Sequence, residues 1–253
     1  MPMTVNFLVF IVDQLNASHL GCHGSAAGAT PHLDRLAGQS WKADESYVAT
    51  PLCMPNRASL LTGRMPSAHG VRRNGIPLSL GARTFADALR DAGYTTVMVG
   101  KSHLQNITGK PPLTDPGRGP WGPDAQRPYP GDYLQESAPR WMGGEVPLEL
   151  PFYGFDRVEL AIQHGDLPSG HYRSWLEREH PQALALAGRN NAQPAPDYEL
   201  TRVGQAWRTR LPPSLHPTAW VADRTIHHLR GVASGNRPFL AYCSFPDPHS
   251  PYT

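Results

Sequence analysis

Three short apolar runs constrain the fold of this 253-residue chain more than any other feature of its sequence. They lie at residues 5–12 (VNFLVFIV), 95–99 (TTVMV) and 239–245 (FLAYCSF), and polar residues follow each of them closely. Continuous apolar runs of this length are typical of strands that are covered on both faces. We therefore expect a central strand at residues 5–12 and two further buried strands.

Patterns typical of helices accompany these runs. Thr30 and Pro31 would begin a short helix, and Thr84 would cap a second helix that Gly93 ends. A third helix would begin at Pro217. Its apolar face would consist of Ala219, Ala222, Ile226, Leu229 and Ala233. Because strand and helix alternate near both ends of the chain, we predict an α/β fold, with a mainly parallel sheet and helices on both of its faces.

The middle of the chain differs in composition. Of the 27 prolines and 24 glycines in the sequence, many lie at residues 109–131 and 181–213. Proline and glycine interrupt regular elements, so we interpret this part as an elaborate insertion rather than a second α/β repeat. The length fits one large domain, or part of one.

The distribution of charge and cysteine argues against several classes of partner and site. Lysine and arginine are spread along the chain and the formal net charge is +2, so we expect neither nucleic acid nor a membrane as partner. Three scattered cysteines are too few for a disulfide framework or a thiolate zinc site, which fits a reducing compartment. The early apolar run lacks the features of a signal peptide. We therefore expect a cytoplasmic protein, and the oligomeric state stays open.

Polar residues follow all three predicted strands. Asp13 and Gln14 follow the first strand, Lys101 and His103 follow the second, and His249 comes shortly after the third. In parallel sheets, ligands bind beyond the carboxyl ends of the strands. We therefore expect these side chains to converge on one site.

The stretch at residues 50–64, TPLCMPNRASLLTGR, holds the most informative cysteine. Pro55 suits the first turn of a helix, so Cys53 would lie at a helix N-terminus, where free N–H groups favour an anion. Arg57 would add a cation one turn later. For a lone cysteine, burial beside a proline is the alternative. We interpret Cys22 and Cys243 as core residues.

The C-x-P-x-R block followed by ASLLTGR resembles the signature of the sulfatase family. The segments NFLVFIVDQ, ATPHLDRLA, VGKSHL and PFLAYCSFPDPHSPY are similar to that family as well, and the proline-rich middle is least similar. The resemblance implies an alkaline-phosphatase-like fold and an enzyme that hydrolyses sulfate esters. It implies one sulfatase catalytic domain, in its amino-terminal portion, over residues 1–253, with a Pro/Gly-rich insertion at about residues 105–213.

The same resemblance implies a modified nucleophile and a metal ion. Cys53 would be oxidised to formylglycine by a formylglycine-generating enzyme, and the hydrated aldehyde would attack the sulfur of a small-molecule sulfate ester. Asp13, Gln14 and Cys53 would bind a divalent cation, with Ca²⁺ preferred over Mn²⁺ or Mg²⁺. Many relatives have a second aspartate where this chain has Gln14, which resembles choline-sulfatase-like and phosphonate-monoester-hydrolase-like members.

Further roles are implied for the polar residues. Arg57 would brace the modified residue and the metal carboxylates, Lys101 would bind sulfate, and His103 would bond to the formylglycine diol. His249 would contact the leaving-group oxygen and act as general acid. Asn74 would either bind substrate or shape a turn.

Other residues have plainer interpretations. We expect His216 to be a helix cap or surface residue, and His227 and His228 to lie on the exposed face of the last helix. Three tryptophans of the middle segment would either stack on a substrate ring or simply pack. They are Trp121, Trp141 and Trp175.

Two other functions stay open. A phosphonate monoester or phosphodiester hydrolase would share the nucleophile and Gln14, whereas Lys101 and His103 favour sulfate. Sulfatases are normally longer, and a second pair of metal ligands comes from a later D-H-G or D-N-G segment, which this sequence lacks. An inactive fragment or a non-catalytic binding module is therefore the third interpretation. Alone, such a piece would expose sheet strands, bind divalent metal weakly and turn over slowly or not at all.

Overall fold

The computed structural model describes residues 5–26, 30–113, 129–194 and 207–249. Its centre is a sheet of four strands in the order β1-β4-β2-β3, and every neighbouring pair is parallel. The strands are β1 (Phe7–Val12), β2 (Thr95–Gly100), β3 (Arg157–Leu160) and β4 (Phe239–Phe245). The predicted parallel sheet is confirmed, as are the three strands expected from the apolar runs.

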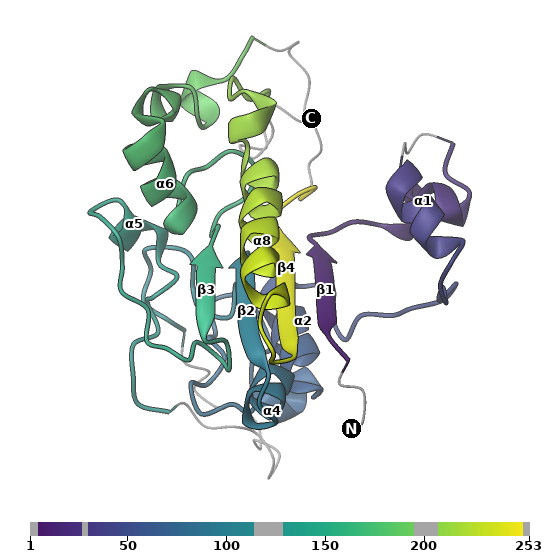
Figure 1. The fold of residues 1–253 in the computed structure, drawn as a ribbon. Coiled ribbons are helices and arrows are strands. Elements are labelled where there is room, and N and C mark those ends of the chain that lie inside the picture. The colour runs from purple at the N-terminus through teal and green to yellow at the C-terminus, as the bar shows by residue number, and fades with distance from the viewer. Residues whose placement is uncertain (1–4, 27–29, 114–128, 195–206, 250–253) are drawn as a thin grey trace.

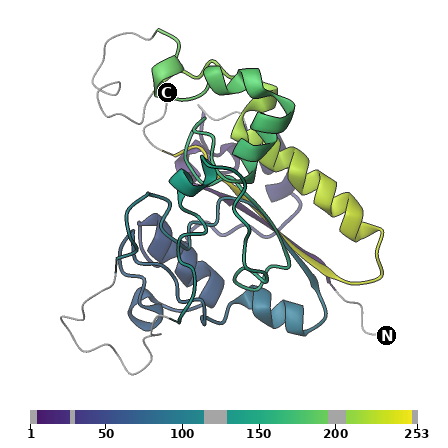
Figure 2. The same ribbon diagram turned by 90° about the vertical axis from the view of Figure 1, so that its left-hand side faces the viewer.

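Helices cover both faces of this sheet. The α-helices are α1 (Pro31–Ala37), α2 (Cys53–Thr62), α3 (Pro66–His69), α4 (Phe85–Asp91), α5 (Ala138–Trp141), α6 (His171–Glu179) and α8 (Pro217–Ala233). Short 3₁₀ helices are η1 (Ala17–His19), η2 (Gly21–His23), η3 (Pro181–Ala185), η4 (Arg189–Asn191) and η5 (Pro213–Leu215). In Figure 1, α8 crosses in front of the strands and α2 and α4 lie behind them, and Figure 2 shows the sheet between these layers.

The alternation of side chains along the strands divides the core into two clusters. Val97 and Val99 of β2 face α6 and α8, where they pack with Trp220 and Val221. Met98, between them, faces the opposite way, into the cluster that includes residues of α2. Because β2 and β4 are covered on both faces, their carboxyl ends are held firmly, and any site built there has a rigid base.

The predicted position of β1 was wrong. Among the described residues β1 pairs with β4 alone and lies at the edge of the sheet, where Phe7 is 40% and Phe10 55% exposed. A continuous apolar run indicates that a strand can be buried on both faces, but it does not say which strand forms the edge. The expectation of exposed sheet strands agrees with this arrangement.

The predicted helix boundaries are largely confirmed. Thr84 forms a capping box with Asp87 at the start of α4, and Gly93 follows the helix with a φ of 90°. The α1 helix begins at Pro31, but Thr30 makes no cap bond to the helix backbone and bonds instead to the side chain of Asp34. The His216 ring accepts the Thr218 N–H at the start of α8, which confirms its expected role as a cap.

The predicted apolar face of α8 was wrong. The buried residues are Pro217, Trp220, Val221, Thr225 and Val232, whereas Ile226 is 45% exposed. The larger Trp220 and Val221 side chains select the face that packs on the sheet, rather than the row of alanines. His228 lies partly buried and bonds to Glu159, so only His227 is on the exposed face as expected.

The middle segment contributes more regular structure than the sequence indicated. It supplies β3, which extends the sheet beside β2, and the helix α6. Trp141 is fully buried and Trp175 packs on the core, so both of these residues pack, whereas Trp121 lies outside the described residues. Cys243 is buried as expected, but Cys22 is only half-buried. None of the described helices combines the length and apolarity needed to span a bilayer. The domain limits stay a prediction.

Candidate functional site

A buried ion pair lies at the carboxyl edge of the sheet. The Lys101 ammonium contacts the Asp13 carboxylate, and Arg57 approaches the same carboxylate at 3.6 Å. Both residues are held through their backbones: Asp13 N donates to Phe245 O at 3.2 Å, and Lys101 N donates to Ser244 O at 2.8 Å. The end of β4 therefore sets the positions of the neighbouring strand ends.

Gly100 permits this close approach. It has a φ of 102°, and an added Cβ would lie 1.9 Å from Ser244 O. Arg57 connects the ends of β2 and β4, because its Nη1 donates to Lys101 O at 2.8 Å and to Ser244 Oγ at 2.9 Å. The ends of β2 and β4 thus meet α2 through Lys101, Ser244 and Arg57.

The charged side chains of Asp13, Lys101 and Arg57 lie close enough to shift the pKa values of Asp13 and Lys101. Burial by itself would raise the pKa of Asp13, but Lys101 and Arg57 outweigh it and hold the pKa below its usual value. Burial lowers the pKa of Lys101, and the carboxylate of Asp13 opposes that change. Asp13 is therefore an ionised carboxylate between two cations.

Cys53 is the first residue of α2 and is half-buried. It lines a cavity of about 640 Å³ together with Asp13, Gln14 and Arg57, which the sequence had assigned to one site. Burial raises the pKa of the Cys53 thiol, and the Asp13 carboxylate raises it further. An unmodified Cys53 is therefore a protonated thiol at neutral pH and a poor thiolate nucleophile.

Asn74 completes the start of α2 from a separate loop. The N-cap residue Leu52 offers no side-chain acceptor, and Asn74 Oδ1 accepts the Met54 N–H at 3.1 Å instead. Of its two interpretations, this contact supports a role in shaping the backbone. Binding of substrate by Asn74 stays a prediction.

His103 is buried in a strained turn. Its φ is 55°, and it is 5% exposed. Burial, together with the charges of Lys101 and Arg57, holds the pKa of His103 well below its usual value, so the ring is neutral. Its Nδ1 has no hydrogen-bond partner among the described residues. A buried polar atom of this kind fits a site that receives a hydroxyl or an anionic oxygen from a bound group.

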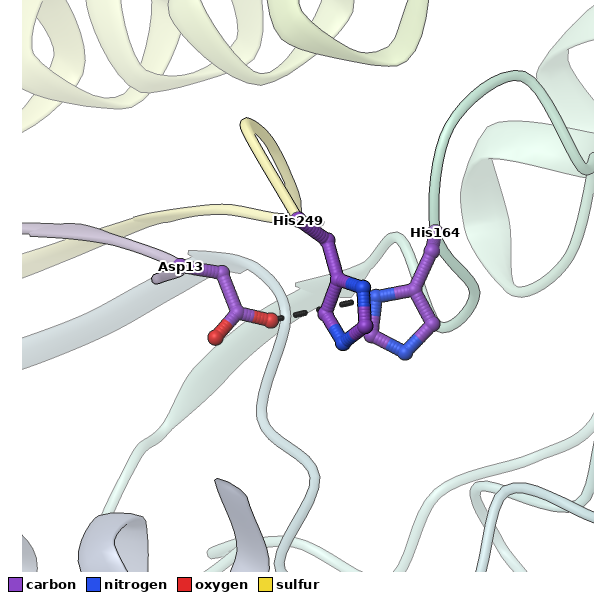
Figure 3. A group of neighbouring side chains, drawn as sticks. All are labelled: Asp13, His164 and His249. Atoms are coloured by element: carbon purple, nitrogen blue, oxygen red, sulfur yellow. Dashed lines mark ion pairs between the residues drawn. The ribbon is translucent and has the colours of Figure 1, made fainter. Parts of the chain in front are cut away.

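Two histidines lie beside the ion pair. The rings of His164 and His249 have centroids 3.6 Å apart, and His164 Nδ1 lies 3.8 Å from Asp13 Oδ2 (Figure 3). His164 Nδ1 is also 3.0 Å from Lys101 Nζ. Burial lowers the pKa of His164 to about 3, with Lys101 adding to the effect, so this ring is neutral and accepts from the ammonium.

Sequence reasoning missed His164. It lies in the middle segment, a few residues after β3, and belongs to no motif. Its only signal is the general rule that residues after parallel strands gather at one edge, and that rule requires β3 to be predicted first. Asp247, two residues before His249, connects this loop to the loop of His164, because it accepts the Gly165 N–H at 3.1 Å. It also accepts the Thr218 hydroxyl at 3.2 Å.

The donor types at the site fit a bound metal ion. The carboxylate of Asp13 and the amide of Gln14 line the same cavity as Cys53, and oxygen donors are those that hard cations prefer. Gln14 is exposed and has a φ of 58°. A second group is formed by Asp13, His164 and His249, whose ligand atoms lie within 4.8 Å of one another. The Lys101 ammonium contacts both Asp13 and His164, so a positively charged side chain already lies at this second group.

Known proteins match the sequence of this chain. Residues 5–125 match the sulfatase family model. The chain is 28% identical over 261 residues to arylsulfatase G of Canis lupus familiaris, an alignment that covers 97% of this chain and 41% of the relative. Over a shorter stretch of 116 residues it is 40% identical to steryl-sulfatase of Mus musculus, covering 41% of this chain and 18% of the relative.

A solved structure shares the fold of this chain. The phosphonate monoester hydrolase of Agrobacterium radiobacter superposes with a TM-score of 0.63 at 25% identity, over 96% of this chain and 41% of that protein. The chain thus spans less than half the length of these relatives. Its fold is the alkaline-phosphatase-like α/β fold, and over residues 5–125 its sequence is similar to the sulfatase family.

Proposed function

We propose that the protein hydrolyses small-molecule sulfate esters through a formylglycine derived from Cys53. One observation carries the proposal: Cys53, at the N-terminus of α2, lines one cavity with Asp13 and Arg57 in a chain that matches sulfatases. A thiol whose pKa is raised would be a poor choice for direct nucleophilic attack. Conversion to an aldehyde hydrate supplies one hydroxyl that can attack sulfur and another whose deprotonation releases sulfate.

We further propose that Asp13 and Gln14 bind a divalent cation, with calcium as the first candidate. Both side chains line the cavity beside Cys53 and offer oxygen donors. A cation bound there would neutralise charge on the sulfate group and the attacking oxygen. Because the amide of Gln14 is uncharged, Asp13 would be the anionic ligand of the two.

The protein's own residues then divide the remaining work. Arg57 and Lys101 place two fixed positive charges at the site, which favours the anionic sulfate group. The unpartnered Nδ1 of His103 is available to bond to a hydroxyl of the modified residue. His249, whose ring packs on His164, is our candidate for the general acid that protonates the leaving alcohol.

A second candidate is hydrolysis of phosphonate monoesters or phosphodiesters. The similarity to the phosphonate monoester hydrolase structure and the presence of Gln14 favour it. Lys101 and His103 favour sulfate instead, because phosphonate hydrolases that this chain resembles tend to carry other residues there.

The test compares initial rates on an aryl sulfate and an aryl phosphonate. The full-length protein is produced together with a formylglycine-generating enzyme, and Cys53→Ala serves as the control that cannot be converted. We expect faster turnover of the sulfate and no turnover by the control. A preference for the phosphonate would support the second candidate, and no multiple turnover on either ester would support a non-catalytic module.

A further inference from the structure

Glu136 is a buried acid that no motif identified. It lies just before α5, is fully shielded from solvent and accepts three consecutive backbone N–H groups. His103 N donates to Oε1 at 2.7 Å, while Leu104 N and Gln105 N donate to Oε2 at 2.8 Å and 2.6 Å. Glu136 therefore contacts every peptide N–H of the turn that contains His103.

Three successive N–H groups that point to one anion form a concave anion-binding backbone. A carboxylate can satisfy all three donors because both of its oxygens accept. A glutamine of the same shape has a single acceptor oxygen and would place an NH₂ group against N–H donors. Burial raises the pKa of Glu136 to about 7, and the three N–H donors oppose that rise. Among the described residues no lysine or arginine forms an ion pair with Glu136, so the backbone is its main stabilising partner.

The segment around Glu136 is itself fixed to the turn. Gln135 N donates to Gln105 Oε1 at 2.9 Å, and Gln105 Nε2 donates to Asp132 O at 3.2 Å. Trp141 of α5 donates to Gln135 O at 2.9 Å. These contacts hold the carboxylate in place, so the turn at residues 103–105 closes on a preformed acceptor.

The turn decides where the His103 ring lies. No partner among the described residues bonds to its Nδ1, and its backbone has a positive φ that a non-glycine residue adopts only under constraint. We propose that Glu136 is a positioning residue that holds the turn at residues 103–105 and thereby places the imidazole of His103 at the catalytic site. This inference rests on the function proposed above, because it gives His103 its task.

The first experiment measures the turn directly and needs no substrate. Amide hydrogen exchange is compared in wild type, Glu136→Gln and the control Ser137→Ala. The Ser137 side chain is also buried, but its hydroxyl donates to Thr108 O rather than accepting from residues 103–105. In Glu136→Gln we expect exchange at residues 103–105 to become at least roughly tenfold faster, an unchanged rate in β2, and a shifted His103 imidazole NMR signal. The control should match wild type.

Two results would overturn the proposal. One is unchanged protection of residues 103–105 in Glu136→Gln, and the other is equal loss of protection across β2, which would indicate general destabilisation. Should Glu136→Gln fail to fold, Glu136→Asp keeps the charge on a side chain one methylene shorter. It should lose protection at residues 103–105 alone, and the same two results would count against the proposal.

The second experiment asks whether Glu136 acts through His103. In the converted enzyme, Glu136→Gln should lower kcat roughly 10–100-fold with KM nearly unchanged, because a misplaced catalytic group costs about that much. The double variant with His103→Ala should be no slower than His103→Ala alone. Additive losses would contradict a shared role. If wild type hydrolyses no ester, the proposed function fails, whereas hydrogen exchange still decides whether Glu136 holds the turn.

Discussion

The Lys101 ammonium contacts the Asp13 carboxylate at the carboxyl edge of the sheet, and both side chains are almost completely shielded from solvent. The Arg57 guanidinium lies near the other oxygen of the same carboxylate. Two buried cations thus depend on one buried anion. Ion pairs within the chain itself therefore hold Asp13, Lys101 and Arg57 together at the candidate site.

Removal of the anion should be costly. Asp13→Asn would leave Lys101 and Arg57 buried without an ionised partner, and we expect a loss of about 3–5 kcal/mol in the free energy of unfolding. Urea denaturation measures it. Asp13→Asn combined with Lys101→Met should recover part of the loss, because the second change removes a stranded charge.

An exposed ion pair provides the matched control. Lys42 Nζ and Asp44 Oδ1 lie 2.7 Å apart on the surface, where solvent screens the pair, so Asp44→Asn should leave the urea midpoint almost unchanged. Equal urea midpoints for wild type and Asp13→Asn would show that the buried pair does not organise the site.

Asn74 should stabilise the start of α2. Asn74→Ala removes the acceptor of the Met54 N–H, so we expect a loss of about 1 kcal/mol and faster exchange of that amide. Asn74→Asp keeps an acceptor oxygen and should restore both properties. If the alanine variant exchanges at the wild-type rate at Met54, the cap is unimportant.

The contact between α8 and β3 should make stability depend on acid pH. Glu159 accepts two bonds of 2.7 Å from Arg224 and one of 2.7 Å from His228. Burial alone would raise the pKa of Glu159, but these partners lower it from 4.5 to about 2. Because the folded value is depressed, the stabilisation is present above pH 4.5 and is lost as the pH falls toward 2.

Urea titrations at several pH values test this sign. Wild type should lose stability on the order of 2 kcal/mol more than Glu159→Gln between pH 5 and pH 2. Parallel pH curves for the two proteins would mean that the Glu159 cluster contributes nothing to the acid response.

The sequence predicted the strands β1, β2 and β4, but neither β3 nor the order of the strands in the sheet. The apolar runs of β1, β2 and β4, with the polar residues after them, were enough to predict that Asp13, Lys101 and His249 lie at one edge of the sheet. Edge or centre is a property of pairing between distant segments, so an apolar run such as that of β1 does not reveal it.

The residues that were missed share a cause. His164 follows β3, a four-residue strand of mixed polarity (RVEL) within the proline-rich middle. Glu136 acts on backbone N–H groups more than 30 residues earlier in the chain, and such contacts leave no spacing pattern. Both depend on loops whose positions are fixed by tertiary packing rather than by local propensity.

The exposed edge of β1 should favour self-association. Among the described residues β1 pairs with a strand on one side only, and Phe10 is exposed, so we expect Phe10→Lys to reduce association, as measured by light scattering, with little change in stability. Trp41→Lys removes a residue that is 89% exposed but lies off the strand, and it should have a smaller effect. Equal effects of both variants would argue against association along the edge.

The central claim is that Cys53 becomes an aldehyde, and peptide mass spectrometry tests it most directly. The protein is produced with a formylglycine-generating enzyme, digested and treated with a hydrazide that traps aldehydes. We predict that the peptide containing Cys53 loses its thiol and gains the hydrazone, while Cys22, half-buried in the same chain, keeps a free thiol. An intact Cys53 thiol, in cells that convert a known sulfatase, would contradict the account.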